Sequence, residues 1–254
     1  MGMSMYNVIA VISDIHSNRL ALEAVLQDLE SRNADLIVNL GDTLFGPIDP
    51  VGTATLLMEQ PEIVNIMGNC DEILLQERSD SLTYKQVKPL LSTAEEEWIS
   101  SFRGTWSYDE LLFCHGTPWN NGRYLLEQVQ LDGTVVYKQP IALAAELQGI
   151  TERIIFCGHS HVFQSIDLPG GKKAVNAGSV GLPAYEDEAP YPHVMESGTN
   201  FASYCLCWRS EGPNSWTIQH RLVEYDWEAA AAMADSKGRN DYAVAIRNGR
   251  MSRV

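Results

Sequence analysis

The chain has few basic residues for its size. Its 254 residues include 18 lysines and arginines against 33 aspartates and glutamates, so the formal net charge is -15 at pH 7. Non-specific binding to nucleic acid or to an anionic membrane depends on positive surface charge. We therefore expect neither a long nucleic acid nor a membrane as a partner. A phosphorylated substrate would have to be attracted locally, by metal ions.

Long apolar runs are also missing. No stretch of about 18 apolar residues is available to span a bilayer. The first residues, MGMSMYN, have neither the basic region nor the apolar core of a secretory signal. We expect a cytoplasmic protein.

Cysteines are few and irregularly spaced. There are five, an odd number, and no pair has the two-residue spacing of a zinc knuckle. Disulfides are therefore not expected. Cys114, Cys157, Cys205 and Cys207 lie within apolar runs, where a buried thiol that packs in the interior is the simpler interpretation.

What is present is an alternation of short apolar runs with amphipathic segments, typical of an α/β protein. We predict strands ending near Ser13 and at 36–40, 62–69, 104–108 and 111–116, with the last two forming a hairpin. Helices are predicted at 17–32, 53–60 and 85–101. Residues 117–150 are harder to interpret, and we predict a helix at 124–130, an extended segment at 134–137 and a helix at 141–148.

The later half changes character. Strand-like runs at 153–161, 162–168, 172–178, 201–209 and 215–223 are joined by turns such as PGGK and EGPN, which favours antiparallel pairing. Residues 226–236 and 241–249 are predicted to be helical. Because no repeat or shift in composition marks a linker, we expect one domain, residues 1–254, with two sheets.

Five of the apolar runs end in residues that can bind a metal ion. The runs read VIAVISDIH, LIVNLGD, EIVNIMGN, LLFCHG and RIIFCGHSH, and the candidate ligands at their ends are Asp14, His16, Asp42, Asn69, His115, His159 and His161. A strand that stops beside a glycine and then presents Asp, Asn or His directs a polar group out of its carboxyl end. Carboxylate, amide and imidazole ligands together suit Mn, Fe, Zn or Ni better than Ca.

Each signature alone is weak, because Gly-Asp is more often a turn than a ligand and a lone buried histidine is usually a hydrogen-bonded core residue. The joint pattern is more specific. Four of only six histidines lie in these signatures, each at the end of a predicted strand. The sequence therefore predicts one convergent metal site.

In that order, the motifs resemble the five motifs of the calcineurin-like metallophosphoesterase superfamily: Asp14-x-His16, Gly41-Asp42, Gly68-Asn69-x-Asp71, His115-Gly116 and Gly158-His159-x-His161. The words DIHSN, GDTLFGPIDP, GNCDE and NAGSVG resemble the small bacterial and archaeal single-domain phosphodiesterase branch. The resemblance covers residues 7–182.

The resemblance implies a four-layer αββα sandwich of two mixed sheets flanked by helices, with two divalent metal ions. One ion would be held by Asp14, His16, Asp42 and His161, and the other by Asp42, Asn69, His115 and His159. Manganese is the expected ion, with iron, zinc or nickel as alternatives. A metal-bridging hydroxide would be the nucleophile, and Asp42, Asn69 and His115 would have the catalytic roles.

The chain departs from the family pattern at three places. Cys70 replaces the histidine that protein-phosphatase members carry after the motif Asn, so substrates with good leaving groups should be favoured. NAGSVGLPAY lacks the family's arginine. Residues 185–200 are longer than the usual connection and are predicted to be a solvated acidic loop, with a lid as the alternative. Asn18 and Arg123 are candidate substrate contacts, although Asn18 could equally cap a helix and Arg123 could be a surface residue.

Three functions follow from these features. The leading hypothesis is a dinuclear metal-dependent phosphoesterase acting on small phosphodiesters or phosphorylated metabolites. A nucleotide or dinucleoside polyphosphate hydrolase is the nearest alternative. A non-catalytic protein-interaction scaffold with the same fold is the alternative from another class, and the intact set of seven ligands counts against it.

Overall fold

Strand β1 (Val8–Ile12) shows why the molecule has stacked layers. Its alternate side chains face opposite ways: Ile9 and Val11 join the core between two sheets, whereas Ala10 and Ile12 join the core under the helices. The same division occurs in β13 (Ala202–Arg209), where Cys205 and Cys207 point between the sheets. Both thiols are buried, as predicted, and so are Cys114 and Cys157. A strand buried on both faces reads as a continuous apolar run.

The computed structural model describes residues 6–210 and 216–251. The first sheet has the order β14-β13-β1-β2-β3 and the second the order β4-β5-β8-β10-β9. Their remaining strands are β2 (Leu36–Asn39), β3 (Val64–Asn65), β4 (Thr105–Tyr108), β5 (Leu111–Cys114), β8 (Ile154–Cys157), β9 (Gln164–Leu168), β10 (Lys172–Asn176) and β14 (Trp216–Val223). Both sheets mix parallel and antiparallel pairs.

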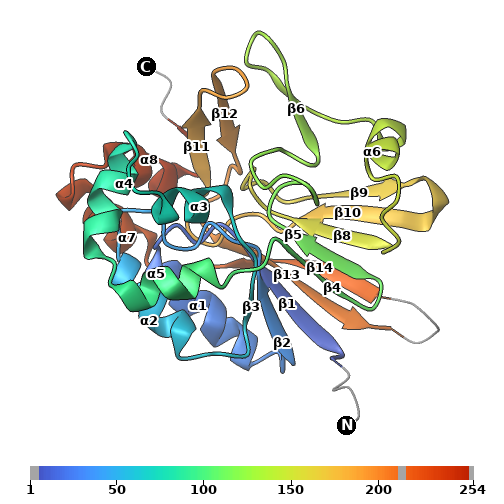
Figure 1. Ribbon diagram of the computed structural model, residues 1–254, viewed down its shortest axis with the longest axis horizontal. Coiled ribbons are helices and arrows are strands. Elements are labelled where there is room, and N and C mark those ends of the chain that lie inside the picture. Colours follow the sequence, from blue (N-terminus) through green and yellow to red (C-terminus); the bar gives the residue numbers. More distant parts are fainter. Residues whose placement is uncertain (1–5, 211–215, 252–254) are drawn as a thin grey trace.

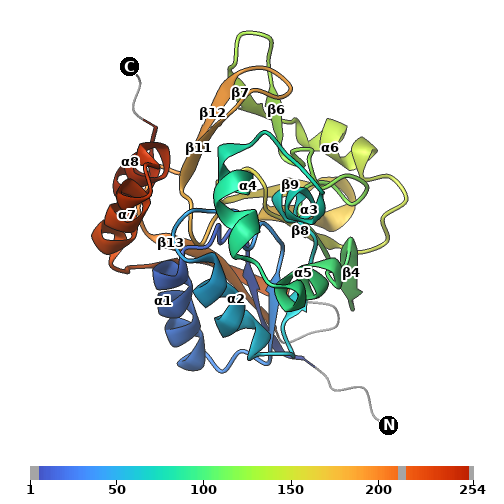
Figure 2. The same ribbon diagram turned by 60° about the vertical axis from the view of Figure 1, so that its left-hand side comes forward.

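Helices cover the outer faces of the two sheets (Figures 1 and 2). On the first sheet these are α1 (Arg19–Glu30), α2 (Pro50–Met58), α7 (Trp227–Ser236) and α8 (Asn240–Asn248), whose apolar faces share one core with β1 and β13. Helix α6 (Pro140–Glu146) covers the second sheet. The fold is therefore the αββα sandwich. Among the described residues, no helix combines the length and apolar character needed to cross a bilayer.

Two predicted elements differ in the region after β2. The predicted strand 62–69 is reduced to the two residues of β3, because Asn69 already begins helix α3 (Asn69–Leu75). The predicted helix 85–101 is interrupted: α4 (Leu82–Val87) is followed by the 3₁₀ turn η1 (Lys88–Leu90) and α5 (Thr93–Ser100). Pro89 lacks the amide hydrogen that a continuous helix would need.

The predicted helix at 124–130 is wrong. Its second half is strand β6 (Glu127–Val129), paired antiparallel with β7 (Val135–Tyr137), which confirms the extended segment predicted there. Glu127 and Val129 are buried while Gln128 between them is exposed, the alternation of a strand. Residues with good helix propensity are held extended here by tertiary pairing.

The later half is antiparallel only in part. Strands β9 and β10 are antiparallel, as are β13 and β14, but β8 runs parallel to both β5 and β10. The long connection through β6, β7 and α6 supplies the crossover that a parallel neighbour needs. The predicted EGPN turn lies outside the described residues.

The segment 185–200 is exposed at residues 188–192, as expected of a solvated loop, but it is not irregular. It forms most of a hairpin of β11 (Ala184–Asp187) and β12 (His193–Glu196). His193 is buried and its Nε2 lies 2.8 Å from the hydroxyl of Tyr124, which anchors the hairpin to the segment before β6.

Candidate metal centre

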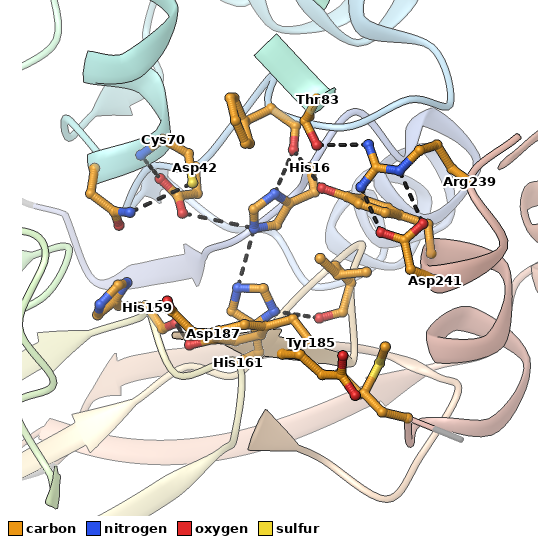
Figure 3. Close-up of a pocket in the computed structure, with 17 residues that line it drawn as sticks. His16, Asp42, Cys70, Thr83, His159, His161, Tyr185, Asp187, Arg239 and Asp241 are labelled. Carbon is orange, nitrogen blue, oxygen red and sulfur yellow. Dashed lines mark hydrogen bonds and ion pairs between the residues drawn. The ribbon is translucent and has the colours of Figure 1, made fainter. Parts of the chain in front are cut away.

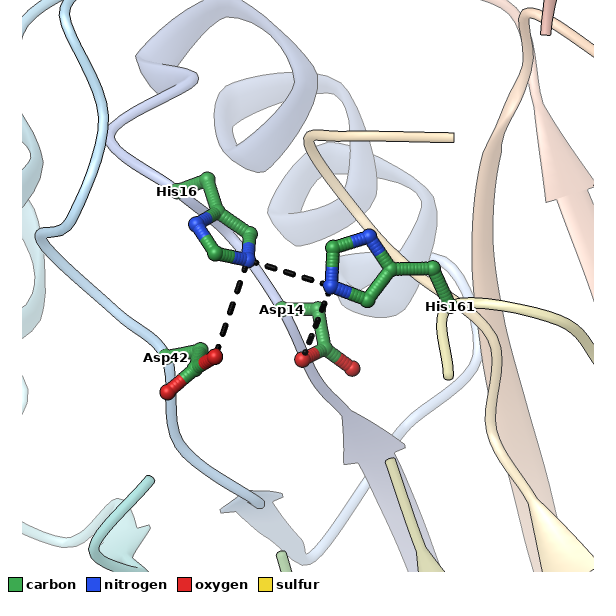
Figure 4. Close-up of side chains that lie close together, drawn as sticks. All are labelled: Asp14, His16, Asp42 and His161. Carbon is green, nitrogen blue, oxygen red and sulfur yellow. Dashed lines mark hydrogen bonds and ion pairs between the residues drawn. The ribbon is translucent and has the colours of Figure 1, made fainter. Parts of the chain in front are cut away.

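The candidate ligands follow the carboxyl ends of five strands. Asp14 and His16 follow β1, Asp42 follows β2, Asn69 follows β3, His115 follows β5, and His159 and His161 follow β8. The structure brings all of them together in two groups that share Asp42. In the first, donor atoms of Asp14, His16, Asp42 and His161 all lie within 4.8 Å of one another (Figure 4), and in the second so do those of Asp42, His115 and His159.

Asn69 joins the second group. Its Oδ1 lies 3.0 Å from Nε2 of His115. The two groups therefore contain all seven residues that the sequence motifs single out, in the division that the resemblance implies.

The backbone is strained where these ligands project. Asp14, His16, Asp42, His159 and His161 all have positive φ, between 46° and 68°. Residues other than glycine rarely adopt this conformation, and such strain is concentrated at functional sites. Tight turns at the strand ends direct the side chains into the centre.

Three of the imidazoles are oriented in the same way. Nδ1 of His16, His115 and His161 lies 2.7, 2.9 and 2.5 Å from the carbonyl oxygens of Phe45, Leu40 and Leu182. A carbonyl oxygen only accepts, so Nδ1 carries the hydrogen and Nε2 of the neutral ring faces the centre with its lone pair. Histidine ligands of metal ions are oriented by the same arrangement.

The donor atoms fit a cation between them. Nε2 of His16 and Nε2 of His161 are 3.1 Å apart, which brings two lone pairs together if both rings are neutral. Oδ1 of Asp14 is buried and has no hydrogen-bond partner, and its nearest imidazole nitrogen, Nε2 of His161, is 3.4 Å away. A buried carboxylate oxygen without a partner is costly unless a positive charge neutralises it. The residues present therefore fit divalent transition-metal ions.

Burial and neighbouring charges together set the protonation of the centre. Burial alone would raise the pKa of Asp42, but the neighbouring imidazoles hold it well below its usual value. Burial would lower the pKa of His115, yet the carboxylates of Asp42 and Asp14 raise it to about 9. Burial and the charge of His115 lower the pKa of His159 to about 3.

Asp71 holds the backbone that carries Asp42 and Asn69. Its carboxylate accepts hydrogen bonds from the backbone amides of Asp42 (2.8 Å), Thr43 (2.9 Å) and Gly68 (3.1 Å). It thereby joins the turn after β2 to the start of α3. Asp71 is part of the motif Gly68-Asn69-x-Asp71, but the sequence alone gave no role to it.

A cavity of about 330 Å³ opens from the metal centre (Figure 3). Beyond the metal-binding residues its walls include Cys70, Tyr185 and Asp187, together with Arg239 and Tyr242 from the C-terminal region. Burial raises the pKa of the Cys70 thiol well above its usual value. Arg239 is held by Asp241 through Nε (3.0 Å) and Nη2 (2.6 Å), and its Nη1 donates to Thr83 Oγ1 (2.7 Å). No local motif in the sequence indicated these C-terminal wall residues.

The two predicted substrate contacts, Asn18 and Arg123, lie in the interior and on the surface, respectively. Asn18 is fully buried: its Oδ1 caps α1, and its amide donates to the carbonyl of Gly181 (2.9 Å) and to the hydroxyl of Tyr225 (3.1 Å). Asn18 is thus the helix cap that the sequence offered as the alternative, and it is not among the residues that line the cavity, so a contact with substrate stays a prediction. Arg123 is exposed on the connection from β5 to β6 and is not among the residues that line the cavity.

Comparison with known proteins agrees with this geometry. The sequence profile of the calcineurin-like phosphoesterase superfamily domain matches residues 8–196. An uncharacterised protein of Methanocaldococcus jannaschii is 26% identical over an alignment of 254 residues that covers 88% of this chain and 90% of that protein.

Two solved structures share the fold. A metallophosphoesterase from Sphaerobacter thermophilus superposes with a TM-score of 0.73 at 21% identity, covering 95% of this chain and 99% of its own. A structure provisionally named a diadenosine tetraphosphatase gives 0.56 at 16% identity, with coverage of 87% and 96%. The profile match spans most of the chain and includes every ligand-bearing strand end, so the chain belongs to the calcineurin-like phosphoesterase superfamily.

Proposed function

We propose that the protein is a metal-dependent hydrolase of small phosphoric esters, with activated phosphodiesters as its best substrates. The observation that carries the proposal is the pair of ligand groups that share Asp42, with an unpartnered Asp14 oxygen inside the first of them. Asp14, His16, Asp42 and His161 would hold one ion, and Asp42, Asn69, His115 and His159 the other. Manganese is the expected ion.

When bound, two such ions supply a nucleophile at neutral pH by acidifying water, and they neutralise charge on the phosphoryl oxygens. The chain's own residues prepare the site for this chemistry. Carbonyl oxygens fix the rings of His16, His115 and His161, and Asp71 fixes the turn that presents Asp42. Such preorganisation places the ligands before the substrate arrives.

The leaving group receives little help from the protein. Cys70 lines the cavity at the position next to Asn69, and a thiol is a weak general acid there. Esters whose leaving groups depart without protonation should therefore react best. The first candidate substrate is bis-p-nitrophenyl phosphate.

The test combines elemental analysis with turnover of this diester in the presence of Mn²⁺. We expect about two ions per chain and Mn-stimulated hydrolysis. Asp42→Asn should lose metal and reduce kcat/KM on the order of 100-fold or more, because one carboxylate serves both ligand groups. Asp80→Asn makes the same chemical change at a fully exposed carboxylate and should match wild type.

Two results would count against the proposal. Absence of stoichiometric metal together with absence of turnover would refute it outright. Two bound ions without turnover of any small phosphate ester would favour the interaction scaffold instead.

A further inference from the structure

Glu127 on β6 is a buried carboxyl group that forms no salt bridge with any residue that the structure describes. Its residue is 4% exposed, and its Oε1 accepts a hydrogen bond from the hydroxyl of Ser160 at 2.6 Å. Its Oε2 is buried and has no partner. Burying a carboxyl group with one oxygen unsatisfied costs stability, and burial raises the pKa of Glu127 to about 7.

Ser160 connects this carboxyl group to the metal centre. It is fully buried and stands between the two ligands His159 and His161, both of which have positive φ. Nδ2 of Asn176 donates to Ser160 Oγ at 2.9 Å, while Oδ1 of Asn176 accepts from the amide of Gly178. Since the serine oxygen already accepts from Asn176, its own hydrogen is directed to Glu127.

The element that brings Glu127 here lies outside both main sheets. Among the described residues, strand β6 pairs with β7 alone. The residues that lead into β6 contact the loop that carries His159 and His161. The ring of Tyr124 stacks on His159 at a centroid distance of 4.6 Å and an interplanar angle of 24°. Strand β6 and the segment before it therefore contact the ligand loop at two points, the hydroxyl of Ser160 and the ring of His159.

We propose that Glu127 is a positioning residue, which fixes the loop of His159 and His161 through Ser160 and so raises the affinity of the centre for its metal ions. The buried carboxyl group of Glu127 costs stability, and its side-chain hydrogen bond goes to Ser160 in the ligand loop. A destabilising group at such a place is expected to serve function rather than stability. Partners that orient metal ligands typically change metal affinity about 10–100-fold when removed. The inference rests on metal binding as proposed above.

The test measures the Kd for Mn²⁺ from the EPR signal of the free ion, and the melting temperature of the metal-free protein at pH 8. Glu127→Leu and Ser160→Ala each remove the same hydrogen bond and should weaken Mn²⁺ binding about tenfold or more. The double variant should be within about threefold of the weaker single variant, because the bond is lost only once. Glu127→Gln keeps an acceptor for Ser160 and should bind within about threefold of wild type.

The melting temperatures distinguish a positioning role of Glu127 from a general effect on the stability of the protein. Glu127→Gln should melt at or above the wild-type temperature at pH 8, because it removes a buried charge. Glu95→Gln is the matched control: Glu95 is also buried, but its carboxylate caps α5 by accepting from the amide of Ser92 at 2.5 Å. This control should melt lower, because it removes a negative charge that stabilises the N-terminus of α5, and it should keep the wild-type Kd.

Several results would overturn the inference. One is wild-type affinity in both Glu127→Leu and Ser160→Ala, and another is equal loss in Glu127→Gln and Glu127→Leu. A third is a fall in affinity that follows melting temperature in all variants, Glu95→Gln included. If Glu127→Leu fails to fold, Ser160→Ala and Glu127→Gln still decide the question. Wild type that binds Mn²⁺ but hydrolyses no small phosphate ester would count against the proposed function and leave this inference standing.

Discussion

At the scale of single residues, His115 shows how the metal-free centre balances its charge. Its Nδ1 donates to the carbonyl of Leu40, and its Nε2 faces Oδ2 of Asp42 at 3.4 Å and Oδ1 of Asn69 at 3.0 Å. With a pKa of about 9 the ring is cationic at neutral pH. His16 and His159 have lowered pKa values and are neutral there. A metal ion bound by His115, as proposed above, would therefore displace the second proton of this ring at pH 7.

This proton predicts a pH dependence for metal binding. Because the raised pKa keeps His115 protonated below about pH 9, Mn²⁺ affinity should rise with pH, by about tenfold per unit for one displaced proton, and level off above that pKa. Titrations at several pH values, followed by EPR, measure the slope. His115→Ala should bind more weakly and with a flatter slope, whereas His220→Asn should keep the wild-type slope. A slope that is flat in wild type would contradict the assignment.

At the scale of elements, the ends of β2 and β3 are joined through two glycines. A Cβ added to Gly68 would lie 2.1 Å from Oδ1 and 2.3 Å from the backbone nitrogen of Asp42. One added to Gly41, whose φ is +109°, would lie 2.4 Å from the nitrogen of Gly68. The two turns are therefore in backbone contact, and this contact places Asp42 between the ligand groups.

Gly68→Ala should disturb both stability and metal binding. Overpacking against rigid backbone costs roughly 1–3 kcal/mol of unfolding free energy, and displacement of Asp42 should weaken Mn²⁺ affinity by an amount on the order of tenfold or more. Gly104→Ala is the control, because nothing lies within 4 Å of its added Cβ. Chemical denaturation and metal titration of both variants measure the effects. Wild-type metal affinity in Gly68→Ala would show that the turn tolerates displacement.

What the sequence could predict depended on how local each determinant is. The ligand motifs and strands such as β1 and β5 are readable because a few adjacent residues specify a buried strand and the turn after it. The segment 124–130 was misread because pairing with β7 and burial of Glu127 override its helix propensity. Arg239 and Thr83, whose side chains bond near the cavity, are 156 residues apart, so no local pattern could connect them.

At the scale of the whole molecule, charge limits what can approach the centre. The chain carries a net charge of -15, and three of its carboxylates, those of Glu186, Asp187 and Asp241, lie at the cavity wall. Arg239 is the one lysine or arginine among the cavity-lining residues of the described chain, and Asp241 neutralises it through two hydrogen bonds. We therefore expect a polyanionic substrate to be repelled over a long range and to find few cationic side chains at the cavity wall.

The negative charge of the protein predicts which substrates it prefers and how its activity on DNA depends on salt. The expected salt dependence is opposite to that of an enzyme that attracts nucleic acid. For the Mn-bound protein at low salt, kcat/KM for a small aryl diester should exceed that for single-stranded DNA or a phosphopeptide by about tenfold or more, a gap of about 1.4 kcal/mol.

Raising KCl from about 10 mM to about 1 M shortens the Debye length from about 30 Å to about 3 Å. Because screening removes repulsion, kcat/KM for DNA should rise with salt, while that for the singly charged diester should change little. A protein that attracts DNA through basic contacts shows the opposite dependence. If the rate on DNA fell with salt, or if DNA were the better substrate at low salt, the preference for small substrates would have to be abandoned.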